Sequence, residues 1–90
     1  MATPAVNAKF TWLITGCSTG LGRALAQSVL RRGHRCVVTA RNTKQIADIV
    51  APFASSAIAV ALDVKEDRQR RDALARAEDR FGGVDVLVNN

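Results

Sequence analysis

Hydrophobic residues in this chain of 90 gather into four short runs, which are separated by stretches with a different, helical spacing. A run that is apolar throughout and rich in β-branched residues is typical of a strand buried on both faces of a parallel sheet. We therefore predict four strands, over residues 10–15, 36–40, 57–62 and 84–88.

Three segments between these runs carry apolar residues at helical spacing. The first helix is expected over residues 21–32, with an inward face of Leu21, Ala24, Leu25, Ser28 and Val29. The second is a short stripe with Thr43 as its N-cap, made of Ile46, Ile49, Val50 and Phe53. The third is expected over residues 66–81, with an inward face of Ala73, Leu74, Ala77 and Phe81. Gly33 and Gly82 are the expected stops of the two longer helices.

The predicted order of elements is βαβαβαβ. Right-handed crossovers between parallel strands place helices on both faces of the sheet. The expected fold class is therefore α/β, with a parallel sheet that forms half of a doubly wound, or Rossmann, nucleotide-binding fold. We expect residues 1–8 to be a loose N-terminal tail and residues 9–90 to be the N-terminal part of a single domain.

Positive charge is concentrated in the first half of the chain. The net charge is +5, and seven of the thirteen Lys and Arg residues lie at or before Val50, together with one of the eight acids. Such a half could bind nucleic acid through its phosphates, but the three Phe and one Trp form no stacking platform and no nucleic-acid motif is present. We therefore expect no nucleic-acid partner, and we place the charge on solvated helix faces near a small phosphate site.

Residue counts exclude several other classes. No apolar run approaches the roughly 20 residues of a membrane span, and residues 1–10 lack the pattern of a secretory signal, so we expect a cytoplasmic protein without a membrane partner. Two cysteines and one histidine are too few for a disulfide framework or a zinc site. Cys17 and Cys36 are expected at opposite ends of neighbouring strands, reduced and unbridged, and His34 at the surface.

The stretch T-G-C-S-T-G-L-G, residues 15–22, lies between the first predicted strand and the first helix. A helix N-terminus has unpaired N–H groups and a partial positive charge, so it attracts a pyrophosphate. Gly16 and Gly20 would let that anion approach the backbone, and Gly22 would let the helix pack closely on the strand. The candidate cofactor residues of this turn are Gly16, Ser18, Thr19, Gly20, Leu21 and Gly22. A purely structural glycine-rich turn is the alternative.

This spacing resembles the T-G-x-x-x-G-x-G pattern of the short-chain dehydrogenases/reductases. Asp63-Val64, at the end of the third strand, and D-V-L-V-N-N, residues 85–90, are similar to later motifs of that family, the second leading into its N-N-A-G. The resemblance implies that Asp63 reaches the adenine amino group, that the Val64 N–H reaches the ring, and that Asn90 belongs to the cofactor site. An ordinary strand-end aspartate is the alternative for Asp63. The stretches C-S-T-G-L-G and T-A-R-N most resemble the retinol- and hydroxysteroid-dehydrogenase-like branch.

The end of the second predicted strand discriminates between NAD and NADP. Enzymes that use NAD usually place an acid there, which binds the ribose hydroxyls, whereas this chain has Ala40 followed by Arg41. A missing carboxylate removes the repulsion of a 2′-phosphate, and an arginine offers it a bidentate donor pair. Asn42 could add a further donor. We therefore predict NADP rather than NAD, with an ordinary exposed loop cation as the alternative for Arg41.

The resemblance implies hydride transfer between NADP(H) and a small alcohol or carbonyl substrate, a Ser–Tyr–Lys catalytic set, and a homo-oligomer in the complete protein. In the family that set follows N-N-A-G, the motif in which this chain stops at Asn90, and the chain contains no tyrosine. We therefore assign no catalytic residue and expect the 90 residues alone to be an inactive, self-associating cofactor half. A non-catalytic dinucleotide-binding or sensing module is the alternative.

Overall fold

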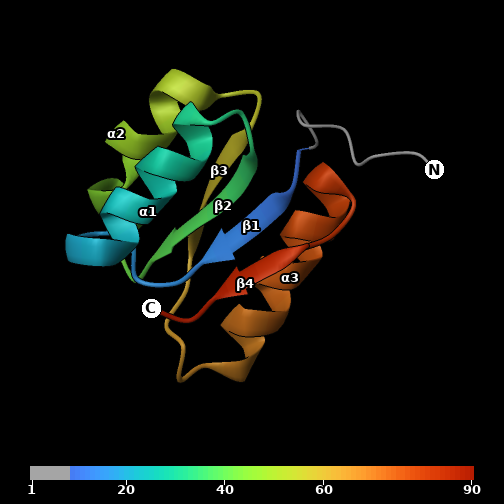
Figure 1. Ribbon diagram of the computed structural model, residues 1–90. Coiled ribbons are helices and arrows are strands. Elements are labelled where there is room, and N and C mark those ends of the chain that lie inside the picture. Colours follow the sequence, from blue (N-terminus) through green and yellow to red (C-terminus); the bar gives the residue numbers. More distant parts are fainter. Residues whose placement is uncertain (1–8) are drawn as a thin grey trace.

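The sheet has the expected parallel topology in a computed structural model, which describes residues 9–90 (Figure 1). The predicted tail, residues 1–8, lies outside the described residues. The strands are β1 (Thr11–Ile14), β2 (Arg35–Ala40), β3 (Ala57–Ala61) and β4 (Val86–Val88). They lie in the order β3-β2-β1-β4, and all three pairings are parallel. The predicted α/β class is confirmed, and three of the four strands are one or two residues shorter than expected.

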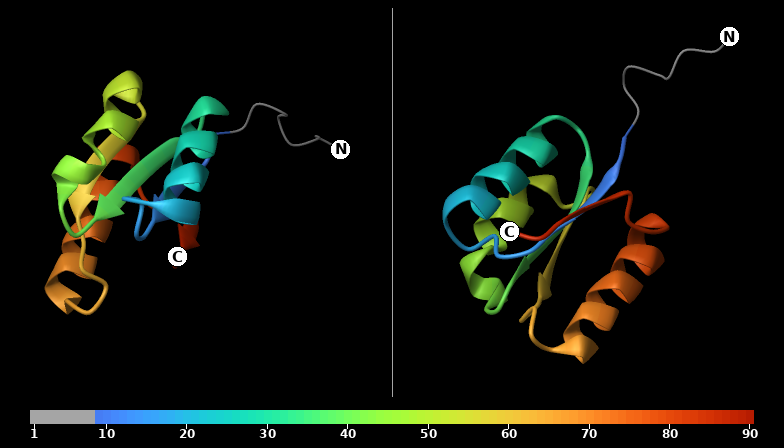
Figure 2. Two further views of the ribbon diagram at one scale, coloured as in Figure 1. Left: turned by 90° about the vertical axis from the view of Figure 1, so that its left-hand side faces the viewer. Right: turned by 60° about the horizontal axis from the view of Figure 1, so that its bottom comes forward.

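Helices cover both faces of this sheet, as the crossover argument requires. The helical elements are α1 (Gly20–Arg31), η1 (Thr43–Gln45), α2 (Ala47–Val50), η2 (Ala51–Phe53) and α3 (Asp67–Phe81). The right-hand view of Figure 2 shows α1 and α2 on one side of the sheet and α3 on the other. The side changes because the chain turns back after β3 to place β4 beside β1. None of the described helices is both long enough and apolar enough to cross a membrane.

The core consists of two hydrophobic layers, one on each face of the sheet. Adjacent residues of a strand point to opposite faces, so Ile14 belongs to the layer beneath α1 and Leu13 to the layer beneath α3. Ala26 of α1 and Ala77 of α3 are each fully buried against their layers. Small side chains at these contacts let both helices lie close to the sheet.

The predicted inward face of α1 is partly wrong. Leu21 is 77% exposed, and Ala24 is exposed as well. The buried residues of this helix are Gly22, Ala26, Val29 and Leu30. The buried face begins with a glycine, which a hydrophobicity pattern does not count as a core residue, so the predicted face was placed too close to Leu21.

Leu74 of α3 was expected in the core and is 49% exposed instead. Ala73 and Ala77 alone are buried on this helix, because its closest approach to the sheet is through alanines. Leu74 lies at the flank of α3 and borders an apolar groove that also contacts Leu13 and Leu87.

The segment after β2 is less regular than the predicted short helix. Ile46 and Ile49 are buried as expected, but the chain forms three consecutive short helical turns. The predicted cap, Thr43, is the first residue of η1, and the Asn42 side chain performs the capping. Asn42 Oδ1 accepts a hydrogen bond from the Lys44 N–H at 3.0 Å. An asparagine in this position is a good cap because its side-chain oxygen reaches the unpaired N–H groups of the turn.

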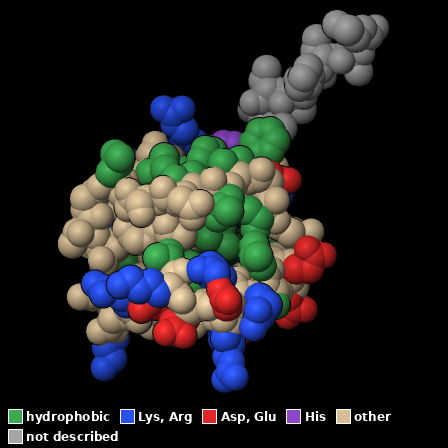
Figure 3. All heavy atoms as spheres, turned by 90° about the horizontal axis from the view of Figure 1, so that it is seen from below, with side chains coloured by type: hydrophobic (Ala, Val, Ile, Leu, Met, Phe, Trp, Pro, Cys, Tyr) green, Lys and Arg blue, Asp and Glu red, His purple; other side chains and the backbone are tan. Residues whose placement is uncertain are grey.

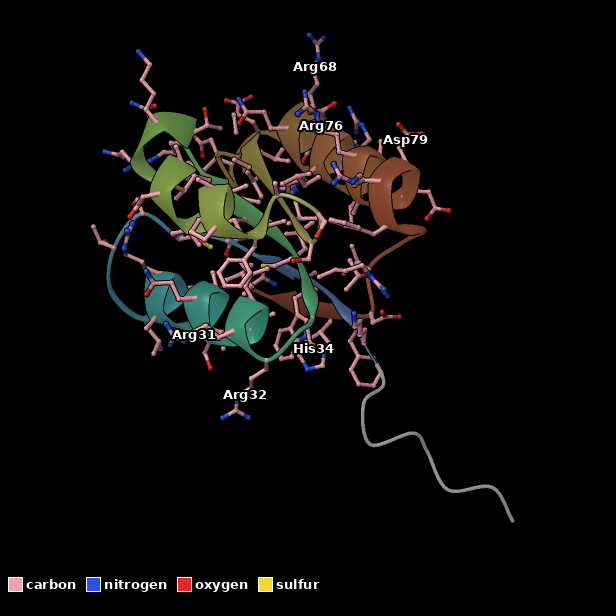
Figure 4. The ribbon with its side chains drawn as sticks, turned by 90° about the horizontal axis from the view of Figure 1, so that it is seen from above. Arg31, Arg32, His34, Arg68, Arg76 and Asp79 are labelled. Carbon is pink, nitrogen blue, oxygen red and sulfur yellow. The ribbon has the colours of Figure 1, made fainter. Side chains whose placement is uncertain are left out.

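His34 lies at the surface with its side chain half-buried. Its Nδ1 accepts a hydrogen bond from the Phe10 N–H at 3.1 Å, and its ring stacks on the Phe10 ring with 5.7 Å between centroids. Figure 4 shows His34 beside the start of β2, at the amino edge of the sheet. The histidine therefore holds the beginnings of β1 and β2 together.

Both cysteines are free and buried. They belong to the same hydrophobic layer beneath α1. Burial raises the pKa of the Cys17 thiol and raises that of Cys36 to about 12, with the Cys17 thiol contributing to the rise at Cys36. Neither thiol is poised to react at neutral pH.

Cys36 should make the stability of the protein fall at alkaline pH. The folded chain keeps the Cys36 proton up to pH values near 12, whereas an ordinary thiol loses it near 9. Between these values the unfolded state binds fewer protons, so the stabilisation is complete below the lower pKa and declines as pH rises. The decline is at most about 1.4 kcal/mol per pH unit. Urea unfolding between about pH 8 and pH 11 should show a flatter decline for Cys36→Ala, and equal slopes would contradict this account.

Candidate functional site

A cleft of about 310 Å³ opens at the carboxyl ends of β1, β2 and β3. Open α/β sheets bind ligands at this edge, where the loops that follow the strands converge. The residues that line the cleft are Thr15, Gly16, Ser18, Thr19, Ala40, Arg41, Leu62, Asp63, Val64, Lys65 and Asn90. Figure 3 looks at the molecule from below and shows Lys, Arg, Asp and Glu side chains along one side of a hydrophobic area.

Most of the predicted cofactor residues line this cleft. Those that do are Gly16, Ser18, Thr19, Arg41, Asp63, Val64 and Asn90. Those that do not are Gly20, Leu21, Gly22 and Asn42. Gly20 and Leu21 form the first turn of α1, and the Asn42 side-chain oxygen is engaged in capping η1.

The glycine turn has a backbone that favours glycine at two positions. Gly16 has φ of 64° and Gly20 has φ of 63°, in the left-handed region. A Cβ built on Gly20 would meet no heavy atom within 4 Å, so it would project into open space at the start of α1. Thr19, the N-cap of α1, makes no side-chain capping bond, and the first turn contains no acidic residue. The helix N-terminus therefore presents its N–H groups to an anion.

Gly22 has no room for a side chain. A Cβ there would lie 2.4 Å from the Gly16 carbonyl oxygen and 2.4 Å from Asn90 Nδ2. The expected close packing of α1 thus occurs against the glycine turn and Asn90. This contact sets the position of the helix N-terminus relative to the cleft.

Asn90 joins the end of β4 to the glycine turn. Its Nδ2 donates a hydrogen bond to the Gly16 carbonyl oxygen at 3.0 Å, and its N–H donates to Thr15 Oγ1 at 2.8 Å. The Thr15 hydroxyl in turn donates to the Val88 carbonyl at 3.3 Å. Asn90 therefore supports the turn as well as lining the cleft.

Ile14 and Thr39, which the sequence did not single out, also hold the turn. The Ile14 carbonyl, at the end of β1, accepts hydrogen bonds from Thr39 Oγ1 at 2.7 Å and from Cys17 Sγ at 3.2 Å. The Cys17 N–H donates to the Thr39 carbonyl at 2.8 Å. The sequence offers one signal for the role of Thr39, which is its hydroxyl within an otherwise apolar run. A buried hydroxyl needs a hydrogen-bond partner.

The loop after β3 forms a tight turn around Asp63. The Asp63 Oδ1 accepts a hydrogen bond from the Lys65 N–H at 3.0 Å, and the Asp63 carbonyl accepts from the Glu66 N–H at 2.9 Å. The Val64 N–H has no hydrogen-bond partner among residues 9–90. The turn therefore leaves one backbone donor and one carboxylate oxygen, Asp63 Oδ2, for a ligand in the cleft.

The cations of the first half of the chain are divided between two edges of the sheet. Arg41 follows β2 at the cleft, and its exposed side chain makes no hydrogen bond or ion pair within the described part of the chain. Arg23 is committed to an ion pair with Asp48. Figure 4 shows Arg31 and Arg32 pointing outward at the far end of α1, away from the cleft. Of these four cations, Arg41 is therefore the one available to a ligand in the cleft.

Within residues 9–90, no group of three or more His, Cys, Asp and Glu side chains is arranged to hold a metal ion. The chemistry that this cleft offers is therefore that of backbone N–H groups, hydroxyls, one carboxylate and two cations, Arg41 and Lys65.

Comparisons with known proteins agree with this architecture. The family model described as short chain dehydrogenase matches residues 11–90. Oxidoreductase BOA17 of Botryotinia fuckeliana is 39% identical over 80 residues, which cover 88% of this chain and 29% of that protein. A short-chain dehydrogenase from Streptomyces avermitilis superimposes with a TM-score of 0.85 at 40% identity, over 92% of this chain and 30% of that one. YwfH, an NADPH-dependent reductase involved in bacilysin biosynthesis, gives a TM-score of 0.80 at 31% identity, over 92% and 37%.

The chain thus spans about a third of the length of these relatives. The residues matched by the family model include all four strands of the sheet. The family match over nearly all of the chain and the shared fold lead to one assignment. This chain belongs to the short-chain dehydrogenase family of NAD(P)-dependent oxidoreductases.

Proposed function

We propose that this chain is the cofactor-binding part of an NADP-dependent oxidoreductase that transfers a hydride between NADP(H) and a small alcohol or carbonyl substrate. The observation that carries the choice of NADP is the end of β2. There, Arg41 borders the cleft without a partner among residues 9–90, and Ala40 occupies the position where NAD-dependent enzymes usually carry an acid.

The glycine turn fits the pyrophosphate of a dinucleotide. The N-terminus of α1 offers N–H groups and a positive dipole end without a competing side-chain cap or acid. The open space beside Gly20 would be occupied by the phosphates. Ser18 and Thr19 line the same part of the cleft and supply hydroxyl donors.

The loop after β3 fits an adenine ring. Adenine presents an acceptor nitrogen beside a donor amino group on one edge. The Val64 N–H is a donor without a partner in the described chain, and Asp63 Oδ2 is an acceptor next to it. This pair complements that edge of the ring.

Arg41 would bind the adenosine 2′-phosphate. A guanidinium can form two parallel charge-assisted hydrogen bonds to a phosphate, and no acid at Ala40 opposes the anion. The related reductase YwfH is described as NADPH dependent, which supports the same preference here. Lys65, at the other wall of the cleft, adds a second positive charge.

NADP, when bound, supplies the hydride or accepts it. The residues of this chain would hold the cofactor through its adenosine and phosphate groups. The proposal extends to association of the complete protein as a homo-oligomer and to a cytoplasmic location. The retinol- and hydroxysteroid-dehydrogenase-like branch stays a prediction. A non-catalytic dinucleotide-binding or sensing module is the second candidate, and the same cleft would serve it.

Replacement of Arg41 should change cofactor preference. Loss of a charge-assisted phosphate pair costs about 1.5–3 kcal/mol, so Arg41→Ala should weaken NADP(H) binding by roughly 10- to 150-fold and change NAD(H) binding little. Titration of both cofactors measures the two affinities. Arg31→Ala is the matched control, because Arg31 is an exposed arginine at the opposite edge. Equal losses for both cofactors in Arg41→Ala would overturn the assignment, and Ala40→Asp should move the preference toward NAD.

A methyl group on Gly20 should block cofactor binding. Gly20 and Gly33 both have positive φ, and a Cβ at either position would meet nothing within 4 Å. Alanine therefore imposes a similar backbone strain of about 1–2 kcal/mol at both sites. We expect Gly20→Ala to lose more than about 10-fold in NADP+ affinity because its methyl group enters the pyrophosphate space. Gly33→Ala should bind NADP+ as tightly as the wild type does. Its stability should equal that of Gly20→Ala. Equal affinities of the two variants for NADP+ would place the phosphates elsewhere.

The 90 residues alone should not oxidise NADPH in the presence of a carbonyl compound, however much NADPH is supplied. Reduction of a carbonyl needs a proton donor, and a positioned acid contributes roughly 10²–10⁴-fold. The family uses a tyrosine for this step, and the chain has none. The rate of NADPH consumption with and without protein is the measurement. Consumption above the rate without protein would show that a different group of this chain supplies the proton.

A further inference from the structure

The loop that follows β3 has almost all of its backbone donors paired. The Leu62 N–H donates to the Ala40 carbonyl, and the N–H groups of Lys65 and Glu66 both bond to Asp63. Val64 is the exception, because its N–H has no partner among residues 9–90. The loop therefore leaves a single backbone donor, the Val64 N–H, without a partner within residues 9–90.

The Asp63 N–H, another donor of this loop, is paired with a side chain of α3 rather than with the loop itself. The Asp63 N–H donates to Gln69 Oε1 at 2.6 Å, across six residues of sequence. Gln69 lies in the first turn of α3, and its side chain is half-buried. The Leu62 N–H bonds to β2, so the Asp63 N–H points to the open edge of the sheet, where a side-chain oxygen accepts its hydrogen bond because no strand of the described chain lies there.

A second residue of α3 holds the other side of the same loop. The Arg70 guanidinium donates to the Val64 carbonyl and forms an ion pair with Asp67. Gln69 accepts from the N–H of the peptide that joins Leu62 to Asp63. Arg70 donates to the carbonyl of the peptide that joins Val64 to Lys65. Together they fix the rotation of the intervening peptide, which carries the Val64 N–H.

We propose that Gln69 and Arg70 are positioning residues that set the adenine specificity of the cofactor site. This inference rests on the proposed function, because it assumes that adenine binds between Val64 and Asp63. Neither side chain is a lining residue at the cleft, so both act through the peptide that they orient. Gln69 contributes more, since its hydrogen bond is half-buried, whereas Arg70 is exposed and its ion pair is screened by solvent.

The decisive test compares NADP+ with its analogue that carries hypoxanthine in place of adenine. Hypoxanthine lacks the amino group and carries a proton on the ring nitrogen that accepts from Val64, so a correctly held loop discriminates against it. Gln69→Met keeps the length of the side chain but removes the acceptor. We expect this variant to bind NADP+ about 5- to 30-fold more weakly and the hypoxanthine analogue nearly as well as the wild type does.

Gln69→Glu retains an acceptor oxygen at the same place and should restore the preference for adenine. Arg70→Leu gives a second, independent test and should lower the preference about 2- to 5-fold. Arg71→Leu is its matched control, because Arg71 is an exposed neighbour on α3. Arg70→Leu carries the test if Gln69→Met does not fold, as judged by circular dichroism.

The outcomes separate this inference from the proposed function. A wild-type protein that does not bind NADP+ would refute the proposed function before any variant is compared. A wild type that binds NADP+ and prefers adenine, together with variants that keep that preference, would refute the positioning role alone. Equal weakening of both dinucleotides in Gln69→Met would also refute it, because that result indicates a general loss of structure.

Discussion

The contact between Gly22 of α1 and the Gly16 carbonyl oxygen is the constraint on which the rest of the site depends. A side chain on Gly22 would lie 2.4 Å from that oxygen, so α1 can approach the turn this closely only with glycine there. The same oxygen accepts a hydrogen bond from Asn90, which ties the end of β4 to the turn. One carbonyl therefore fixes three elements at the carboxyl edge of the sheet, and it directs the N-terminus of α1 toward the cleft.

The two halves of the site differ in how they are held. The phosphate half is built from backbone geometry, with positive φ at Gly16 and Gly20 and support from buried groups such as Thr39. The adenine half is a short loop that depends on side chains from α3 for its conformation. We infer that the first half is rigid by packing, whereas the second can be altered by single substitutions on the surface of α3.

Much of this fold could be predicted from the pattern of the sequence, because its strongest signals are local. Largely apolar runs indicated every strand, and the glycine spacing indicated the turn between the first strand and the first helix. The inward face of α1 could not be found in this way, since Gly22 is buried for lack of a side chain while Leu21 projects outward. The roles of Thr39, Gln69 and Arg70 were also missed. Their hydrogen bonds join segments whose contact depends on the tertiary fold, and no spacing in the sequence shows that Gln69 reaches back to Asp63.

The central claim is that the ADP half of NADP lies across the carboxyl edge, with its adenine on Val64 and its pyrophosphate on the first turn of α1. Titration of the ¹⁵N-labelled protein with NADP+, followed by its amide resonances, tests this claim most directly. We predict the largest shifts at Val64 and Gly20, with the Val64 amide proton moving downfield as it acquires an acceptor. The amides of Arg31 and Arg32, at the far end of α1, should stay unchanged. Saturable binding of NADP+ that leaves the Val64 and Gly20 amides unmoved would contradict the account.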